Sequence, residues 1–184
     1  MTVRANYLIG EKPTPAEWNT FIANPGLDYI TQINVNAVTT TISNVFSSTY
    51  DNYRLEFQGC YSTSGSGTFP LISFTGGTGT AHYDGMRVVE STGAVVLNGQ
   101  NGTGYWIGGF GGNGIANAAQ ITYDFFQPYV LTQTTYVARY NYNQGGGFVG
   151  GYLNNTNSYT GFTITGLFST NVSGVLNVFG YRKA

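Results

Sequence analysis

From residue 29 onward, the sequence is a succession of short strand-like segments separated by turn residues. The segments are rich in Val, Thr, Tyr and Phe, which suit the half-buried surface of a β-sheet, and Gly, Asn and Ser cluster between them. The expected strands cover residues 29–34, 37–42, 50–58, 69–75, 86–90, 94–97, 104–107, 119–125, 129–142, 148–153, 160–168 and 174–182. Strands at intervals of about 8–12 residues with Gly-rich turns indicate a β-sandwich or a β-barrel. We therefore expect an all-β, antiparallel fold.

The segment at residues 50–58 has the clearest alternation of apolar and charged side chains. Tyr53, Leu55 and Phe57 would share one face of a strand, and Arg54 and Glu56 would share the other. This pattern predicts one face toward the core and one toward solvent. On the solvent face, we expect Glu56 to pair with Arg54 or with a neighbouring strand.

Two further segments have a predicted place in the sheet. Residues 90–94 form an expected tight hairpin, because Gly93 can adopt the positive φ that such turns need. Residues 174–182 are largely apolar on both sides. We expect this last strand to lie inside a sheet or against another subunit.

The N-terminal residues contain the one good helix signal. Thr14 can cap a helix, Pro15 suits its first position, and Glu17 completes a capping box. The apolar stripe of this helix would consist of Trp18, Phe21 and Ile22. We expect residues 1–28 to be an anchoring segment with one short helix, and residues 29–184 to form the β-domain.

The charge content excludes several classes of protein. Only 8% of the residues are charged, compared with about 25% in typical soluble domains. A net charge of −1 gives no basic patch for nucleic acid. No apolar run is long enough for a transmembrane helix, and the first residues do not resemble a signal peptide. Electrostatic repulsion between nearly neutral chains is weak and does little to keep them apart in solution. The composition therefore favours a protein that belongs to an oligomeric assembly.

Residues able to do chemistry are few. His82 is the only histidine, and with Asp84 it gives too few ligands for zinc. No nucleophile-elbow motif surrounds a serine, and Cys60, in a strand-like run, is expected to be buried. We therefore predict no catalytic residue, metal or cofactor. Cleavage of a glycan by two of the eight carboxylates stays open as an alternative.

Aromatic residues on a polar background are the positive signal for a site. The candidates for contact with a ligand or receptor are Tyr105, Trp106, Tyr152 and Tyr159. Flat rings beside Asn and Gln amides suit sugar binding. The same rings also suit a protein interface or a core, so these alternatives remain open.

Two motifs carry a resemblance to a known class of protein. They are residues 46–55 (FSSTYDNYRL) and residues 174–183 (GVLNVFGYRK). Both resemble patterns in tail-fibre and other surface proteins of phage virions, notably those of marine and cyanobacterial phages. The resemblance implies a jelly-roll-like β-sandwich that assembles as a homotrimer, and it implies no catalytic residues. The chain departs from a tail fibre in lacking a long fibrous shaft.

The resulting hypothesis is a non-enzymatic structural protein of the virion surface, made in the host cytoplasm. Its expected role is host attachment, as a short tail fibre or fibre tip whose loops contact a host surface glycan. The first alternative is a capsid decoration (cement) protein that binds neighbouring virion proteins, with residues 1–28 as a clasp. The second alternative is a glycan-degrading enzyme.

Overall fold

The computed structural model describes residues 26–63, 67, 69–76, 83–91, 94–103, 106–107, 109, 111–143 and 145–182. This part of the chain is mostly antiparallel β-structure, as the sequence predicts. The strands are β1 (Leu27–Ala37), β2 (Thr39–Ile42), β3 (Asn52–Ser62), β4 (Pro70–Thr75), β5 (Tyr83–Ser91), β6 (Ala94–Thr103), β7 (Trp106–Ile107), β8 (Gly112–Asn113), β9 (Ala119–Phe126), β10 (Thr135–Tyr142), β11 (Gly145–Leu153), β12 (Gly161–Gly166) and β13 (Val172–Tyr181). Two short 3₁₀ turns, η1 (Ile115–Asn117) and η2 (Leu167–Ser169), complete the described elements.

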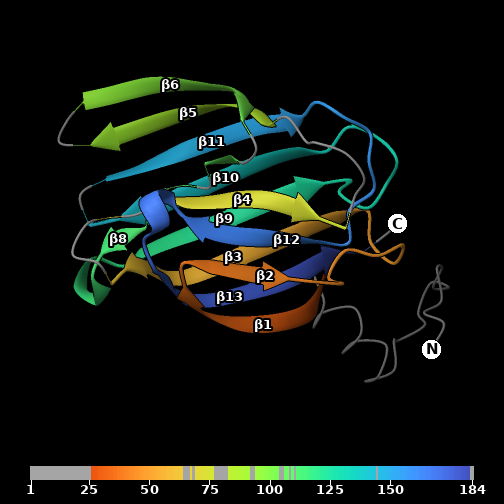
Figure 1. Cartoon of the computed structure of the whole chain (residues 1–184), viewed down its shortest axis with the longest axis horizontal. Helices are drawn as coiled ribbons and strands as arrows, with labels where there is room; N and C mark the ends of the chain where they lie inside the picture. The colour runs from red at the N-terminus through yellow and green to blue at the C-terminus, as the bar shows by residue number, and fades with distance from the viewer. Residues whose placement is uncertain are drawn as a thin grey trace, which may run out of the picture.

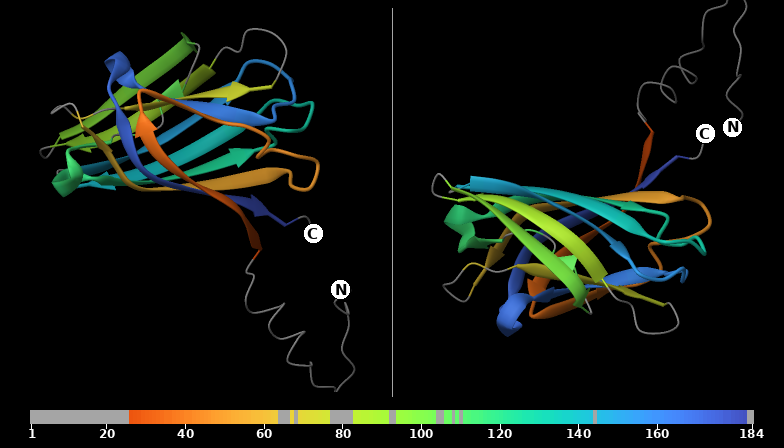
Figure 2. Two further views of the ribbon diagram at one scale, coloured as in Figure 1. Left: turned by 60° about the horizontal axis from the view of Figure 1, so that its bottom comes forward. Right: turned by 90° about the horizontal axis from the view of Figure 1, so that it is seen from above.

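The strands form two sheets that lie face to face (Figures 1 and 2). The larger sheet has the order β1-β13-β3-β9-β10-β11-β5-β6, and the short β8 pairs in parallel with β3. The smaller sheet has the order β2-β12-β4-β7. In Figure 1 the smaller sheet covers the middle of the larger one, and β11, β5 and β6 extend beyond it. The larger sheet therefore offers a wide face on its outer side.

Aromatic rings from both sheets hold the two layers together. Phe125 on β9 of the larger sheet contacts Phe74 on β4 and Phe162 on β12 of the smaller sheet, with ring centroids 5.1 and 6.2 Å apart. Phe46, from the loop between β2 and β3, stacks on Phe162 at 5.7 Å. All four rings are buried. Such ring pairs contribute about 0.5–1.5 kcal/mol each beyond the burial of their area.

Several predictions from the sequence are confirmed. Tyr53, Leu55 and Phe57 are buried on β3, at 0–1% exposure, and Cys60 is also buried. The last strand, β13, pairs with β1 on one side and with β3 on the other. Strands β5 and β6 form the predicted hairpin, with Ser91 opposite Ala94.

Other expectations need correction. The strand predicted over residues 129–142 begins only at Thr135, because residues 127–132 form turns: Val130 N–H donates to the Gln127 carbonyl, and Thr132 N–H to that of Val130. The strand predicted over residues 160–168 ends at Gly166, where η2 begins. Leu27 and Asp28, assigned above to the anchoring segment, are part of β1. The predicted helix with Trp18, Phe21 and Ile22 lies outside the described residues.

Candidate functional site

The outer face of strands β10, β11 and β5 carries an unusual row of side chains. Along β10 the buried Ala138 and Tyr140 face the core, so Arg139 between them faces outward and is exposed. The register places Phe148 of β11 opposite Arg139, and Val88 of β5 opposite Phe148. Residues 88, 139 and 148 thus form one row across three strands.

Glycine alternates with aromatic residues on this face of β11. Its outward positions are Gly146, Phe148, Gly150 and Tyr152, while Val149 between them is buried. The two glycines place no side chain on the sheet surface on either side of Phe148. The Phe148 ring, 48% exposed, therefore has no side chain next to it along its own strand on this face.

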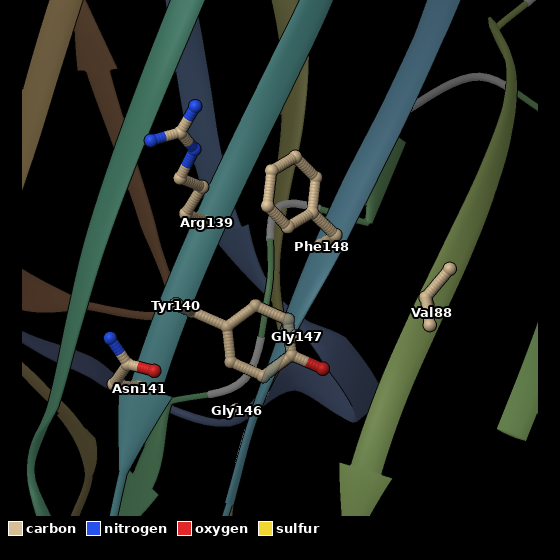
Figure 3. A pocket seen from close by; sticks show the side chains of 7 residues that line it. All are labelled: Val88, Arg139, Tyr140, Asn141, Gly146, Gly147 and Phe148. Carbon is tan, nitrogen blue, oxygen red and sulfur yellow. The ribbon is translucent and has the colours of Figure 1, made fainter. Parts of the chain in front are cut away.

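This arrangement leaves two hollows, one on each side of Phe148. The larger has a volume of about 360 Å³, and its lining includes Val88, Arg139, Asn141, Gly146 and Phe148. Figure 3 shows Arg139, Phe148 and Val88 standing side by side on three neighbouring strands. The smaller hollow has a volume of about 250 Å³. Its lining residues are Val88, Val137, Phe148, Val149 and Gly150.

Among the described side chains that line the two hollows, Arg139 is the charged one. Its guanidinium carbon lies over the Phe148 ring, 5.1 Å from the centroid, which is a cation–π contact. The other two arginines with described side chains each have a carboxylate partner: Arg54 pairs with Asp124, and Arg182 pairs with Asp28. Within the described residues Arg139 has no ion pair.

Two further exposed rings extend the surface beyond Phe148. Tyr152 of β11 lies opposite Thr135 of β10, which in turn lies opposite Phe126 of β9. Tyr152 is 42% exposed and Phe126 is 37% exposed. We call the set formed by Phe126, Arg139, Phe148 and Tyr152 with the two hollows the outer-face site.

No protein-family model, curated protein or solved structure matches the chain. Within the described residues, no three His, Cys, Asp or Glu side chains gather where they could hold a metal ion. No helix in that part of the chain has the length and apolar character needed to cross a membrane. The chemistry available at the site comes from a guanidinium, aromatic rings and the Asn141 amide.

The structure places the four aromatic candidates from the sequence in different surroundings. Tyr152 is exposed on the outer-face site. Tyr159 is only 3% exposed: its ring packs on Phe74, and its hydroxyl donates to Asn155 Oδ1 at 3.1 Å, so it offers no ring face to a ligand. The backbone of Trp106 lies in β7 opposite Ile72. Tyr105 and the side chain of Trp106 lie outside the described part, as does His82.

Arg139 and Phe148 are not among the site residues predicted from the sequence. A signal was present in the regular alternation of Gly146, Phe148, Gly150 and Tyr152. Period-2 spacing assigns these residues to one face of a strand. Arg139 lies beside Phe148 because of the register between β10 and β11. The residue spacing within β11 does not reveal that register.

Proposed function

We propose that this chain is a non-enzymatic structural protein of the phage virion surface that attaches the particle to its host, as a short tail fibre or fibre tip. The proposal includes a jelly-roll β-sandwich. The strand orders β1-β13-β3-β9 and β2-β12-β4-β7 support it, because two facing four-stranded sheets with these connections correspond to the double Greek key of a jelly roll. Strands β10, β11, β5 and β6 then extend one of the two sheets.

The outer-face site is the observation that carries a binding role. Three large aromatic rings between 37% and 48% exposed share this face with an arginine that has no ion pair among the described residues. Single exposed apolar residues are common, but a cluster around hollows is typical of a recognition surface. A sheet is also a rigid support, which keeps the entropy cost of binding low.

The carboxylates with described ion pairs already have structural partners. Asp124 accepts hydrogen bonds from Arg54 and from the Tyr181 hydroxyl, and Asp28 accepts from Arg182 and Tyr50. These contacts support a structural rather than a catalytic role for both groups. The glycan-degrading alternative is tested by incubating the full chain with host polysaccharide: new reducing ends would contradict the non-enzymatic proposal.

A second candidate, capsid decoration, is favoured by the position of β1. Within the described part, this 11-residue strand at the edge of the larger sheet pairs with β13 alone. An edge strand can accept a strand from a neighbouring protein. Residues 1–26 precede β1 in the sequence, and in this proposal they bind a neighbouring virion protein.

Immunogold labelling of intact virions that carry this gene separates the two candidates. Gold on the tail tip or on projecting fibres would support attachment. Gold distributed evenly over the head would support capsid decoration instead. Absence of gold from the virion would contradict both.

The proposal includes a homotrimer that contacts other virion proteins. The low charge content of the chain supports assembly, because a nearly neutral free monomer has little electrostatic protection against association. Light scattering on the purified full chain is expected to give the mass of three chains. The mass of a single chain would contradict the trimer.

A further inference from the structure

We infer that the outer-face site binds an acidic glycan, a sugar chain bearing carboxylate groups, with Arg139 as the carboxylate-binding residue. The inference rests on the proposed attachment function and assigns a ligand class and a recognition residue to it. Three features support it: the contacts of Arg139, the shape of the two hollows and the polarity of the residues that line them.

The contacts of Arg139 favour an anionic ligand. The guanidinium carbon lies over the Phe148 ring, and guanidinium N–H groups suit a planar, two-oxygen acceptor such as a carboxylate. The same chain shows this geometry at Arg54, where Nε and Nη2 bind the two oxygens of Asp124 at 2.8 and 3.1 Å. Arg139, which lines the larger hollow, can offer the same fork to a carboxylate of a ligand.

The shape of the site favours a chain over a compact ligand. Both hollows border Phe148, and Gly146 and Gly150 place them in line along β11. A linear glycan lying along β11 would have one unit on each side of the Phe148 ring. Tyr152 lies farther along the same line and extends the surface available to the chain.

The walls of the hollows combine apolar and polar groups in the way that sugars require. Val88, Val137 and the Phe148 ring offer apolar surface to the C–H faces of sugar rings. Asn141 adds an amide at the Arg139 end, where hydroxyl groups of the same sugar unit would lie. Carboxylate recognition is therefore concentrated at the larger hollow, and apolar contact at the smaller one.

The test measures binding of the purified full chain to a microarray of acidic polysaccharides and their neutral partners. The acidic probes are polygalacturonate, alginate, hyaluronate and polysialate, and each is matched with its methyl-esterified or carboxyl-reduced form. We expect binding to at least one acidic probe and loss of that binding on its neutral partner. Because a carboxylate–guanidinium contact is charge-dependent, binding should also weaken as salt is raised.

Variants locate the site. Arg139→Gln should weaken binding of the acidic probe about tenfold, the loss expected for one charge-assisted hydrogen-bonded contact. Arg182→Gln is the matched control, because it removes the same charge from a residue already paired with Asp28. Gly150→Val fills the smaller hollow, where an added Cβ would meet only the Tyr136 carbonyl oxygen, at 3.8 Å. Its control is Gly99→Val on β6, where nothing lies within 4 Å.

Each outcome separates this inference from the proposed function. Binding that weakens in Arg139→Gln and Gly150→Val, but in neither control, supports the site. The inference would be overturned by equal binding to the neutral probes, by an equal loss of binding in the control variants, or by binding to no acidic probe. In each of these cases, gold labelling of the virion tail would still support the attachment function. A change in oligomer mass in Arg139→Gln would also overturn it, because the face would then be a subunit interface. Acidic-glycan binding by a chain absent from virions would overturn the proposed function and keep the site.

Discussion

The guanidinium of Arg54 binds both carboxylate oxygens of Asp124 across the outer face of β3 and β9, with Nε–Oδ1 and Nη2–Oδ2 distances of 2.8 and 3.1 Å. The Tyr181 hydroxyl donates to the same carboxylate at 2.6 Å, and the Tyr181 ring lies 5.5 Å from the guanidinium carbon. Hydrogen bonding to Asp124 raises the pKa of Arg54. The three side chains therefore tie together β13, β3 and β9 at the centre of the larger sheet.

Replacing Arg54 is expected to lower the free energy of unfolding by about 1–2 kcal/mol, because Arg54→Met leaves the half-buried Asp124 without its cation. The matched change is Arg182→Met, which breaks a more exposed pair with Asp28 and should cost less than about 1 kcal/mol. Urea unfolding followed by circular dichroism measures both. Equal losses in the two variants would contradict the structural role assigned to the Arg54–Asp124 pair.

The partner of Arg54 could not be predicted from the pattern of its own strand. The alternation in residues 50–58 correctly places Arg54 on the solvent face of β3. We expected Glu56 to pair with Arg54 or with a neighbouring strand, whereas the partner that the structure gives Arg54 is Asp124, 70 positions away in sequence. A strand's own pattern determines which face a residue occupies, but its cross-strand neighbours depend on register. Arg139 was missed as a site residue for the same reason.

The fold itself was largely predictable because local signals agree with it. Apolar residues at period 2 and Gly-rich turns identified most strands within a few residues of their observed ends. The exceptions are segments whose composition suits a strand but whose backbone bonds elsewhere. Apolar residues 129–131 belong to turns, and Tyr159, a candidate for ligand contact, is buried against Phe74. Burial of a loop residue depends on the packing of distant elements, so a loop's composition does not reveal it.

A contact between the two motifs that carry the phage resemblance leads to a second prediction. The ring of Tyr50, from the first motif, lies directly over Gly180, from the second. A Cβ on Gly180 would overlap that ring, so Gly180→Ala should lower stability by about 1–3 kcal/mol through overpacking. Gly150→Ala is the matched control on an open strand surface and should be neutral or slightly stabilising. Thermal unfolding of both variants tests this, and equal melting temperatures would show that the Tyr50 ring moves aside at no cost.

Cys60 leads to a prediction about reactivity. Its thiol is buried, and desolvation raises its pKa well above the ordinary value, so the thiolate is scarce at neutral pH. We expect a thiol reagent to label the native chain slowly and the urea-unfolded chain at once. Because Cys60 is the only cysteine, the labelling rate at intermediate urea should follow global unfolding. Fast labelling under native conditions would show that β3 opens locally around Cys60.

Tyr181 predicts how stability changes at alkaline pH. Burial, followed by the hydrogen bond to Asp124, raises the pKa of Tyr181 from 10.0 to about 12. Below pH 10 both the folded and the unfolded chain keep this proton, so the contribution is fully present. Between pH 10 and 12 the unfolded chain loses the proton while the folded chain retains it, and stability falls as pH rises.

The variant Tyr181→Phe isolates this contribution from the other tyrosines. Burial also raises the pKa of Tyr123 and Tyr136, and both remain in the variant, so the two proteins differ only at position 181. At pH 8 Tyr181→Phe should be the less stable, because it lacks the hydrogen bond to Asp124. Its stability should then fall less steeply above pH 10, so the difference between the two proteins narrows as pH approaches 12. Urea unfolding at intervals from pH 8 to about 11.5 measures both curves, and parallel curves would show that Tyr181 titrates equally in the folded and unfolded chain.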